Sequence, residues 1–336
     1  MISQEINPHD VVRGILIPHK AFHDGLTRIR TALSFPNTTS EFIGLCVLGE
    51  PGAGKTFLID EIKQEYASIH TSEGWSHPLI RVSVETSAAT MSGLGATILT
   101  ALDPLAATNL KEGEMSRRIR RLMKECHTKI LMIDEWQQVA DYRTDRGIYH
   151  AGDFLKVLGD ERQLFIILSS LPRGESAILK NKQFLRRFLA PIRLPRFDWD
   201  VPDLRNEFAS CLNTFYRGLK DYMPLPPIYE DDWAYRLWCT TGGLIGYLAK
   251  FLELLLMKFS KRSHRKELSL GDFAAVQAEY KYAAENAETT LQPFDPKFSL
   301  NPTLDVLTKA RLIGHESELP AAPVGNSQRI TVRRGK

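Results

Sequence analysis

The apolar residues in the first two hundred positions gather in short runs, and segments with helical spacing separate them. Nearly continuous apolar runs occupy 42–48, 79–84, 129–133, 164–168 and, more weakly, 191–194. Runs of this length are typical of strands buried on both faces of a sheet. Helical spacing occupies 18–35, 57–67, 91–102, 116–126 and 151–162. Strands that alternate with helices predict a parallel α/β sheet with helices on both faces.

The pattern changes near residue 200, where strand signals stop and helical ones continue. The expected helices are 201–219, 230–239, 244–261 and 270–287. From residue 292 the chain is rich in Pro, Gly and Asn without strong periodicity, which is typical of a mobile segment. We therefore expect an N-terminal helical segment (1–40), an α/β core (41–200), a small all-α lid (201–290) and a flexible C-terminal tail (291–336).

Composition adds limits rather than a function. The chain has 336 residues, 43% hydrophobic and 25% charged, which is ordinary for a soluble globular protein. No apolar run reaches the roughly 18–20 residues that span a bilayer, and the N-terminus lacks the pattern of a signal peptide. We therefore expect a cytoplasmic protein without a membrane partner. The four cysteines form no C-x-x-C pair, so zinc and redox motifs are unsupported.

A glycine-rich loop between the first strand and the following helix carries the clearest chemistry. Residues 49–56 fit G-x-x-x-x-G-K-[ST], a loop whose backbone N–H groups point at phosphate oxygens. Lys55 should reach the β- and γ-phosphates, and the Thr56 hydroxyl should ligate Mg²⁺. The cofactors expected are ATP and Mg²⁺. The candidate contacts are Gly49, Glu50, Pro51, Gly52, Ala53, Gly54, Lys55, Thr56, Phe57 and Asp134.

Candidate catalytic residues follow the later strands. Asp134 and Glu135 come directly after the third strand, at the edge of the sheet where the loop should lie. Asp134 would hold Mg²⁺, and Glu135 would polarise the attacking water. After the fourth strand a hydroxyl, Ser170 rather than Ser169, would sense the γ-phosphate. Arg187, beside Arg186, would stabilise phosphate charge in a neighbouring subunit; a solvated basic turn is the alternative.

Together these motifs resemble the AAA+ ATPases, and their finer pattern is similar to the TnsC/TniB branch that regulates target choice in transposons. Three stretches carry the similarity to that branch: 134–139 with 154–161, 187–197, and 241–249. The resemblance covers about residues 15–260. One departure concerns the lid, where many AAA+ proteins place a phosphate-contacting arginine and this chain has Leu244 and Ile245. That departure suits a slow ATP-timed switch.

The resemblance implies a DNA-bound assembly. Such proteins form ATP-bound rings or filaments on double-stranded DNA, here expected as hexamers or heptamers. They receive a signal from a TniQ-type or CRISPR-associated targeting complex and recruit transposase subunits, and ATP hydrolysis resets the assembly. The alternatives are an AAA+ ATPase that remodels protein partners, of secretion or origin-binding type, and a scaffold that binds ATP with little turnover.

Candidate DNA contacts are basic residues near the core. Non-specific DNA binding depends mainly on Lys and Arg side chains that neutralise phosphates. Arg117, Arg121 and Lys124 share one helical stripe, while Arg143 and Arg146 lie in the loop after the third strand. An ordinary solvated helix face and basic loop is the alternative for both groups.

Overall fold

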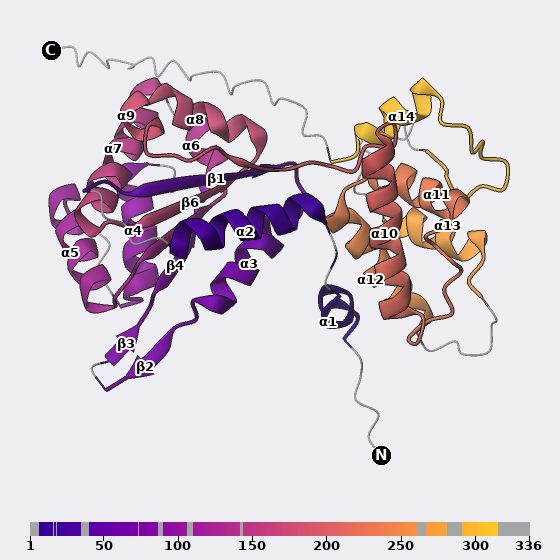
Figure 1. Cartoon of the computed structure of the whole chain (residues 1–336), viewed down its shortest axis with the longest axis horizontal. Coiled ribbons are helices and arrows are strands. Elements are labelled where there is room, and N and C mark those ends of the chain that lie inside the picture. Colours follow the sequence, from indigo (N-terminus) through magenta and orange to yellow (C-terminus); the bar gives the residue numbers. More distant parts are fainter. Residues whose placement is uncertain are drawn as a thin grey trace, which may run out of the picture.

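The structure, a computed structural model, describes most of the chain. The described residues are 7–15, 17, 19–34, 40–72, 74–86, 90–105, 110–141, 144–260, 267–280 and 291–314. An α/β part and an all-helical part lie side by side (Figure 1).

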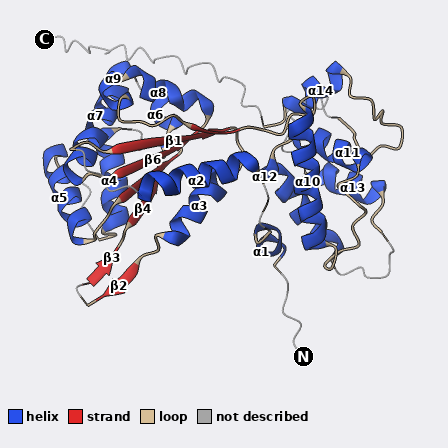
Figure 2. Cartoon of the chain, viewed as in Figure 1, coloured by secondary structure: helices blue, strands red, loops and turns tan. Residues whose placement is uncertain are grey.

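Five parallel strands form the central sheet. In spatial order they are β4 (Leu79–Ser83), β5 (Ile130–Asp134), β6 (Phe165–Ser170), β1 (Ile43–Gly49) and β7 (Ile192–Leu194). The residues of β5 and β6 are all buried, as their unbroken apolar runs require. The predicted parallel sheet is confirmed, and its strands run toward the helical part of the molecule (Figure 2).

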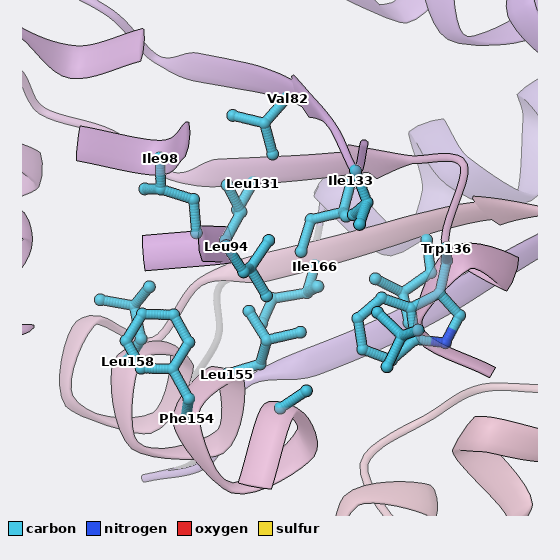
Figure 3. Packing of buried hydrophobic residues seen from close by; sticks show 14 of the residues in the cluster. Val82, Leu94, Ile98, Leu131, Ile133, Trp136, Phe154, Leu155, Leu158 and Ile166 are labelled. Atoms are coloured by element: carbon cyan, nitrogen blue, oxygen red, sulfur yellow. The ribbon is translucent and has the colours of Figure 1, made fainter. Parts of the chain in front are cut away.

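Helices cover both faces of the sheet. On one face α2 (Lys20–Ser34) and α3 (Lys55–Glu65) pack with sheet residues such as Leu45, Met132 and Ile167. On the other, α4 (Met91–Leu102), α5 (Glu112–Glu125) and α7 (Asp145–Arg162) pack with the alternate sheet residues, such as Leu131 and Ile166. Figure 3 shows this second cluster, with Trp136 at its edge near the ends of the strands. The two-residue period of each strand thus divides the core between the faces.

Short elements complete the α/β part. After β5 comes α6 (Gln137–Asp141), and after β6 come η2 (Pro172–Gly174), α8 (Glu175–Lys180) and α9 (Lys182–Leu185). A hairpin of β2 (Ile69–Thr71) and β3 (Gly74–Ser76) projects between α3 and β4 (Figure 1). Its strands are three residues long and lack an apolar alternation, so hydrophobic patterning gives no sign of them.

The all-helical part is built around large aromatic side chains. Its helices are α10 (Pro202–Leu219), α11 (Asp231–Thr241), α12 (Ile245–Phe259), α13 (Leu270–Glu279) and α14 (Leu304–Arg311). Phe208, Trp238 and Phe251 are fully buried among them. Within the described residues no single helix is both long and apolar enough to cross a bilayer; α11 and α12 together are, but they meet at 106°.

Two chain segments lie differently from the expected division. The N-terminal segment splits, since α1 (Pro8–Arg13) packs on α10 and α12 through Val12, whereas α2 packs on the sheet. Residues 291–314, which were expected to belong to a flexible tail, are packed: α14 packs on α11, and the Phe294 ring is buried beside Phe251. Apolar side chains spaced too irregularly to predict an element hold this stretch in place; residues 315–336 lie outside the described residues.

Candidate functional site

The glycine-rich loop joins β1 to α3 in the conformation its sequence predicts. Gly52 and Gly54 have φ of +76° and +96°, values that L side chains rarely adopt. Gly54 is the N-cap of α3 and supplies no side-chain hydrogen bond to it. Lys55 Nζ donates to the carbonyl oxygens of Gly49 and Glu50 at 2.8 and 3.0 Å. The loop is curled, the helix starts without a side-chain cap, and the lysine side chain folds over the loop. These three features fit a bound phosphate group.

The first turn of α12 packs directly on this loop. Gly246 N donates to Gly52 O at 2.8 Å, and a Cβ on Gly52 would lie 2.8 Å from the Tyr247 ring. Leu244 is buried in the cluster formed by α2, α3 and the sheet. The lid therefore meets the loop through backbone, apolar and aromatic groups at the positions where the sequence has no arginine.

Asp134, at the end of β5, faces the same side of the sheet as α3. Arg81 of β4 demonstrates this, because its Nη1 donates to Asp60 of α3 at 2.6 Å and its Nη2 to Asp134 Oδ2 at 2.8 Å. Asp134 Oδ1 accepts from Glu135 N at 3.0 Å. The carboxylate is thus oriented by two donors beside the P-loop helix, which fits the expected role of holding Mg²⁺ together with Thr56.

Glu135 leaves the strand through an unusual backbone. Its φ is +57°, uncommon for a non-glycine residue and a feature that often accompanies functional sites. The residue is exposed, and its Oε2 accepts a hydrogen bond from Gln137 Nε2. The chain therefore turns sharply after Asp134, so that the Asp134 side chain is buried and the Glu135 side chain is exposed.

The two serines at the end of β6 face opposite sides. Ser170 lies on the α4–α7 side, and its Oγ donates to Gln137 Oε1 at 3.2 Å. Ser169 continues the series of Ile167 toward α3, and its buried Oγ has no partner among the described residues. Strand alternation thus places Ser169, rather than the expected Ser170, on the side of Lys55 and Asp134. A phosphate oxygen or a water would satisfy the unpaired hydroxyl.

Arg187 is largely buried and paired within its own chain. Its side chain is only 6% exposed and donates to both oxygens of Asp160, at 2.9 and 2.6 Å. Arg186 is 62% exposed and pairs with Glu41. Since Arg187 O accepts from Gly44 N, both arginines lie near the start of β1, away from the P-loop at its end. Arg187 is thus held within its own chain and Arg186 is the exposed member, and the expected action of Arg187 on a neighbouring subunit stays a prediction.

The basic candidates for DNA binding lie on the surface where they are described. Arg117, Arg121 and Lys124 are exposed on α5, whose opposite face buries Met115, Ile119 and Met123. Arg146 is exposed in the first turn of α7, and Arg143 lies outside the described residues. The amphipathic interpretation of α5 agrees with the structure, and the role in DNA binding stays a prediction.

Sequence reasoning missed three polar residues at the site: Arg81, Gln137 and Arg196. Arg196 follows β7 and donates to the carboxylate of Glu50 and to Gly242 O, which joins the P-loop to the lid. Arg81 interrupts the apolar run 79–84, Arg196 follows the apolar residues of β7, and Gln137 follows the buried Trp136. A buried polar side chain needs a partner, so such interruptions were the available signal.

Comparisons with known proteins agree with this geometry. Three solved archaeal structures share the fold. They are ORC2 of Aeropyrum pernix in ADPNP-ADP complexes (14% identity, 83% of this chain and 73% of that chain, TM-score 0.56), Cdc6p of Pyrobaculum aerophilum (13%, 82% and 72%, 0.57) and Aeropyrum pernix ORC1 in complex with DNA (12%, 81% and 69%, 0.52). They confirm the predicted fold, a parallel sheet with helices on both faces followed by a helical part. No curated protein matches.

A family model matches residues 9–199, which include the whole sheet, the P-loop, Asp134, Glu135 and the β6 serines. That model is described as bacterial TniB protein and covers more than half of the chain. The chain belongs to the TniB family.

Proposed function

We propose that this protein is an ATP-dependent, DNA-binding regulator of transposition that assembles as an oligomer on target DNA. The observation that carries the proposal is the joint placement of Lys55, at the curled loop, and Asp134, on the same side of the sheet, in a chain of the TniB family. The solved relatives named for ADPNP and for DNA support nucleotide and DNA as ligands of this fold.

The residues present fit ATP and Mg²⁺. The loop offers backbone N–H groups and the Lys55 ammonium to phosphate oxygens, while Thr56 and Asp134 offer oxygens to the metal. Bound Mg²⁺ supplies positive charge that neutralises the phosphates. Glu135 would orient and polarise a water molecule, and the Ser169 hydroxyl, which is unpaired among the described residues, would touch the phosphates. Hydrolysis is slow, since the lid turn carries Leu244 and Ile245 where an arginine would accelerate it.

Assembly connects this chemistry to transposition. A ring or filament of six or seven subunits would wrap duplex DNA, with Arg117, Arg121, Lys124, Arg143 and Arg146 as candidate phosphate contacts. A TniQ-type or CRISPR-associated complex would mark the site, and transposase subunits would be recruited to it. Transposition takes place on cellular DNA, so we place the protein in the cytoplasm.

Two measurements on purified protein test the proposal together. ATP hydrolysis is followed with and without duplex DNA, and electron micrographs compare a slowly hydrolysed ATP analogue with ADP. We expect DNA to raise the rate, and rings or filaments only with the ATP analogue and DNA. Equal rates without DNA would instead favour the remodelling of protein partners. Full DNA assembly by Glu135→Gln, with no turnover in the wild type, would favour an ATP-binding scaffold.

A further inference from the structure

Glu135 directly follows the last residue of β5, at a sharp turn of the backbone. The φ of +57° fixes where the side chain starts, but the residue is exposed and its χ angles need a partner to select one orientation. That partner is the Gln137 amide, two residues further along the chain, whose Nε2 donates to Glu135 Oε2.

The Gln137 side chain is itself held in place by hydrogen bonds to the end of β6 and the residue after it. The residue is 2% exposed, and its Oε1 accepts from Leu171 N at 3.1 Å and from Ser170 Oγ at 3.2 Å. A backbone N–H can only donate and a carboxylate can only accept. Both ends therefore require the same amide orientation, with Oε1 toward Leu171 and Nε2 toward Glu135.

Gly174 of η2 packs closely against Ser170 and Gln137. A Cβ on Gly174 would lie 1.9 Å from Ser170 Oγ and 2.9 Å from Gln137 Cα, so η2 closes tightly over the pair. The preceding residue, Trp136, is fully buried, and its N donates to Ser169 O at 3.0 Å. Figure 3 shows the Trp136 ring within the core cluster. The turn that carries Glu135 is thus tied to the end of β6.

The position of β6 in the sheet shows what the connection between Gln137 and the end of β6 can transmit. β6 lies between β1, which carries the P-loop, and β5, which carries Asp134 and leads to Glu135. Its last residues are Ser169, which faces the P-loop side, and Ser170, which faces Gln137. A small displacement at the end of β6 therefore reaches the Glu135 carboxylate through the Gln137 amide, beside the backbone hydrogen bond of Trp136 to Ser169.

We propose that Gln137 is a positioning residue for hydrolysis, whose amide sets the orientation of the Glu135 carboxylate and couples it to the end of β6. The inference rests on the proposed ATPase activity and adds a residue to it. In this role Gln137 acts through Glu135, and a misplaced catalytic group costs rate rather than substrate affinity.

Two variants separate positioning from simple packing. Gln137→Glu keeps the shape and an oxygen that can accept from Leu171 N and Ser170 Oγ, but it replaces the donor that faces Glu135 with a second carboxylate. Gln137→Met removes both ends of the connection. Gln138→Met is the matched control, because the Gln138 side chain accepts from Thr86 Oγ1 at the surface. Its hydrogen bond to Glu135 runs from backbone N to backbone O at 3.0 Å, and the substitution keeps it.

The experiment measures kcat, KM, affinity for a fluorescent ATP analogue and amide exchange over residues 168–174. We expect both Gln137 variants to lower kcat by roughly 10- to 100-fold while nucleotide affinity stays within about twofold. Exchange at Leu171 should rise in Gln137→Met and remain slow in Gln137→Glu. In a Glu135→Gln background neither variant should reduce the rate further, since the affected group is already gone.

Wild-type kcat in Gln137→Glu would overturn the inference, as would equal reductions with and without Glu135. A loss of nucleotide affinity that parallels the loss of rate would show a purely structural role and would also overturn it. These outcomes differ from failure of the proposed function, in which the wild-type protein and Lys55→Ala would show the same negligible hydrolysis.

Discussion

The guanidinium of Arg196 donates to both carboxylate oxygens of Glu50, with Nε at 2.9 Å from Oε1. The same side chain donates to Gly242 O at 3.1 Å and to Ile313 O at 3.2 Å. One residue thereby joins the P-loop, the lid turn and the segment that follows α14. Movement of the P-loop is therefore mechanically coupled to the lid and to the chain that leads toward the C-terminus.

Replacing Arg196 should loosen this junction. In Arg196→Met we expect faster amide exchange over 241–246 and 308–314 and a loss of about 1–3 kcal/mol in unfolding free energy, because buried acceptors lose a charged donor. Arg193→Met is the control, since Arg193 is 57% exposed and pairs only with Glu175 among the described residues. Equal behaviour of the two variants in urea unfolding and in exchange would contradict the coupling.

Arg187 should matter for stability more than its exposed neighbour. Although burial raises the pKa of Asp160, hydrogen bonds from Arg187 and from Phe42 N lower it overall. A lowered carboxyl pKa contributes stability that is present above the unfolded value and is lost as the pH falls through the folded one. We expect Arg187→Ala to reduce the unfolding free energy at pH 7 by about 1–3 kcal/mol.

Arg186→Ala provides the comparison, because that side chain is mostly in water and surface pairs contribute little. The measurement is chemical unfolding of both variants at neutral pH, together with hydrolysis in mixtures with Glu135→Gln. If Arg187→Ala kept wild-type stability and its subunits failed to support hydrolysis by their neighbours, the role of Arg187 expected from sequence, acting in trans, would be correct.

His19 gives the protein a defined sensitivity to acid. Burial lowers the pKa of His19 below its ordinary 6.5, against the opposing effect of Glu207. The unfolded chain then binds more protons than the folded one below about pH 6.5, so this contribution to stability is full above that pH and falls as the pH decreases. His19→Gln should lose less stability than the wild type between about pH 7.5 and 5.5, on either side of the ordinary histidine value. Thermal unfolding at both pH values checks this, and an equal loss of stability in His19→Gln and the wild type would contradict it.

The exposed face of α5 should govern the salt dependence of DNA binding. Removing two charges with Arg117→Gln and Arg121→Gln should weaken binding at every sequence and reduce the slope of log K against log salt by about 0.9 for each DNA phosphate that is no longer neutralised. Fluorescence anisotropy of a labelled duplex in the presence of an ATP analogue measures it. Arg217→Gln with Lys220→Gln, on and just after the lid helix α10, is the control pair. An unchanged slope in the α5 variant would place the DNA-binding residues elsewhere.

Sequence patterns predicted the strands and helices well where buried positions require apolar residues. The runs at 130–134 and 165–170 are strands because every residue is buried, and α4 begins and ends where its periodicity indicates. The P-loop was predictable because only glycine tolerates the φ values at Gly52 and Gly54.

The partners and orientations of the candidate site residues depended on contacts between residues far apart in the sequence. Nothing in the sequence around Arg187 shows that Asp160 will bind it. The residue types of Ser169 and Ser170 could not show which hydroxyl faces α3, because strand register decides it. Arg81, Gln137 and Arg196 orient their acidic partners or join segments, and such roles become visible only once their partners have positions.

Binding of a fluorescent ATP analogue with Mg²⁺ tests the central claim most directly, by comparing the wild type with Lys55→Ala and with Lys63→Ala. Lys63 is an exposed lysine on the same helix, so it controls for charge and helix stability. The account predicts wild-type affinity for Lys63→Ala and a loss of roughly 10- to 100-fold for Lys55→Ala, the value of a charge-assisted contact with phosphate. Equal affinity in all three proteins would contradict a nucleotide site at this loop.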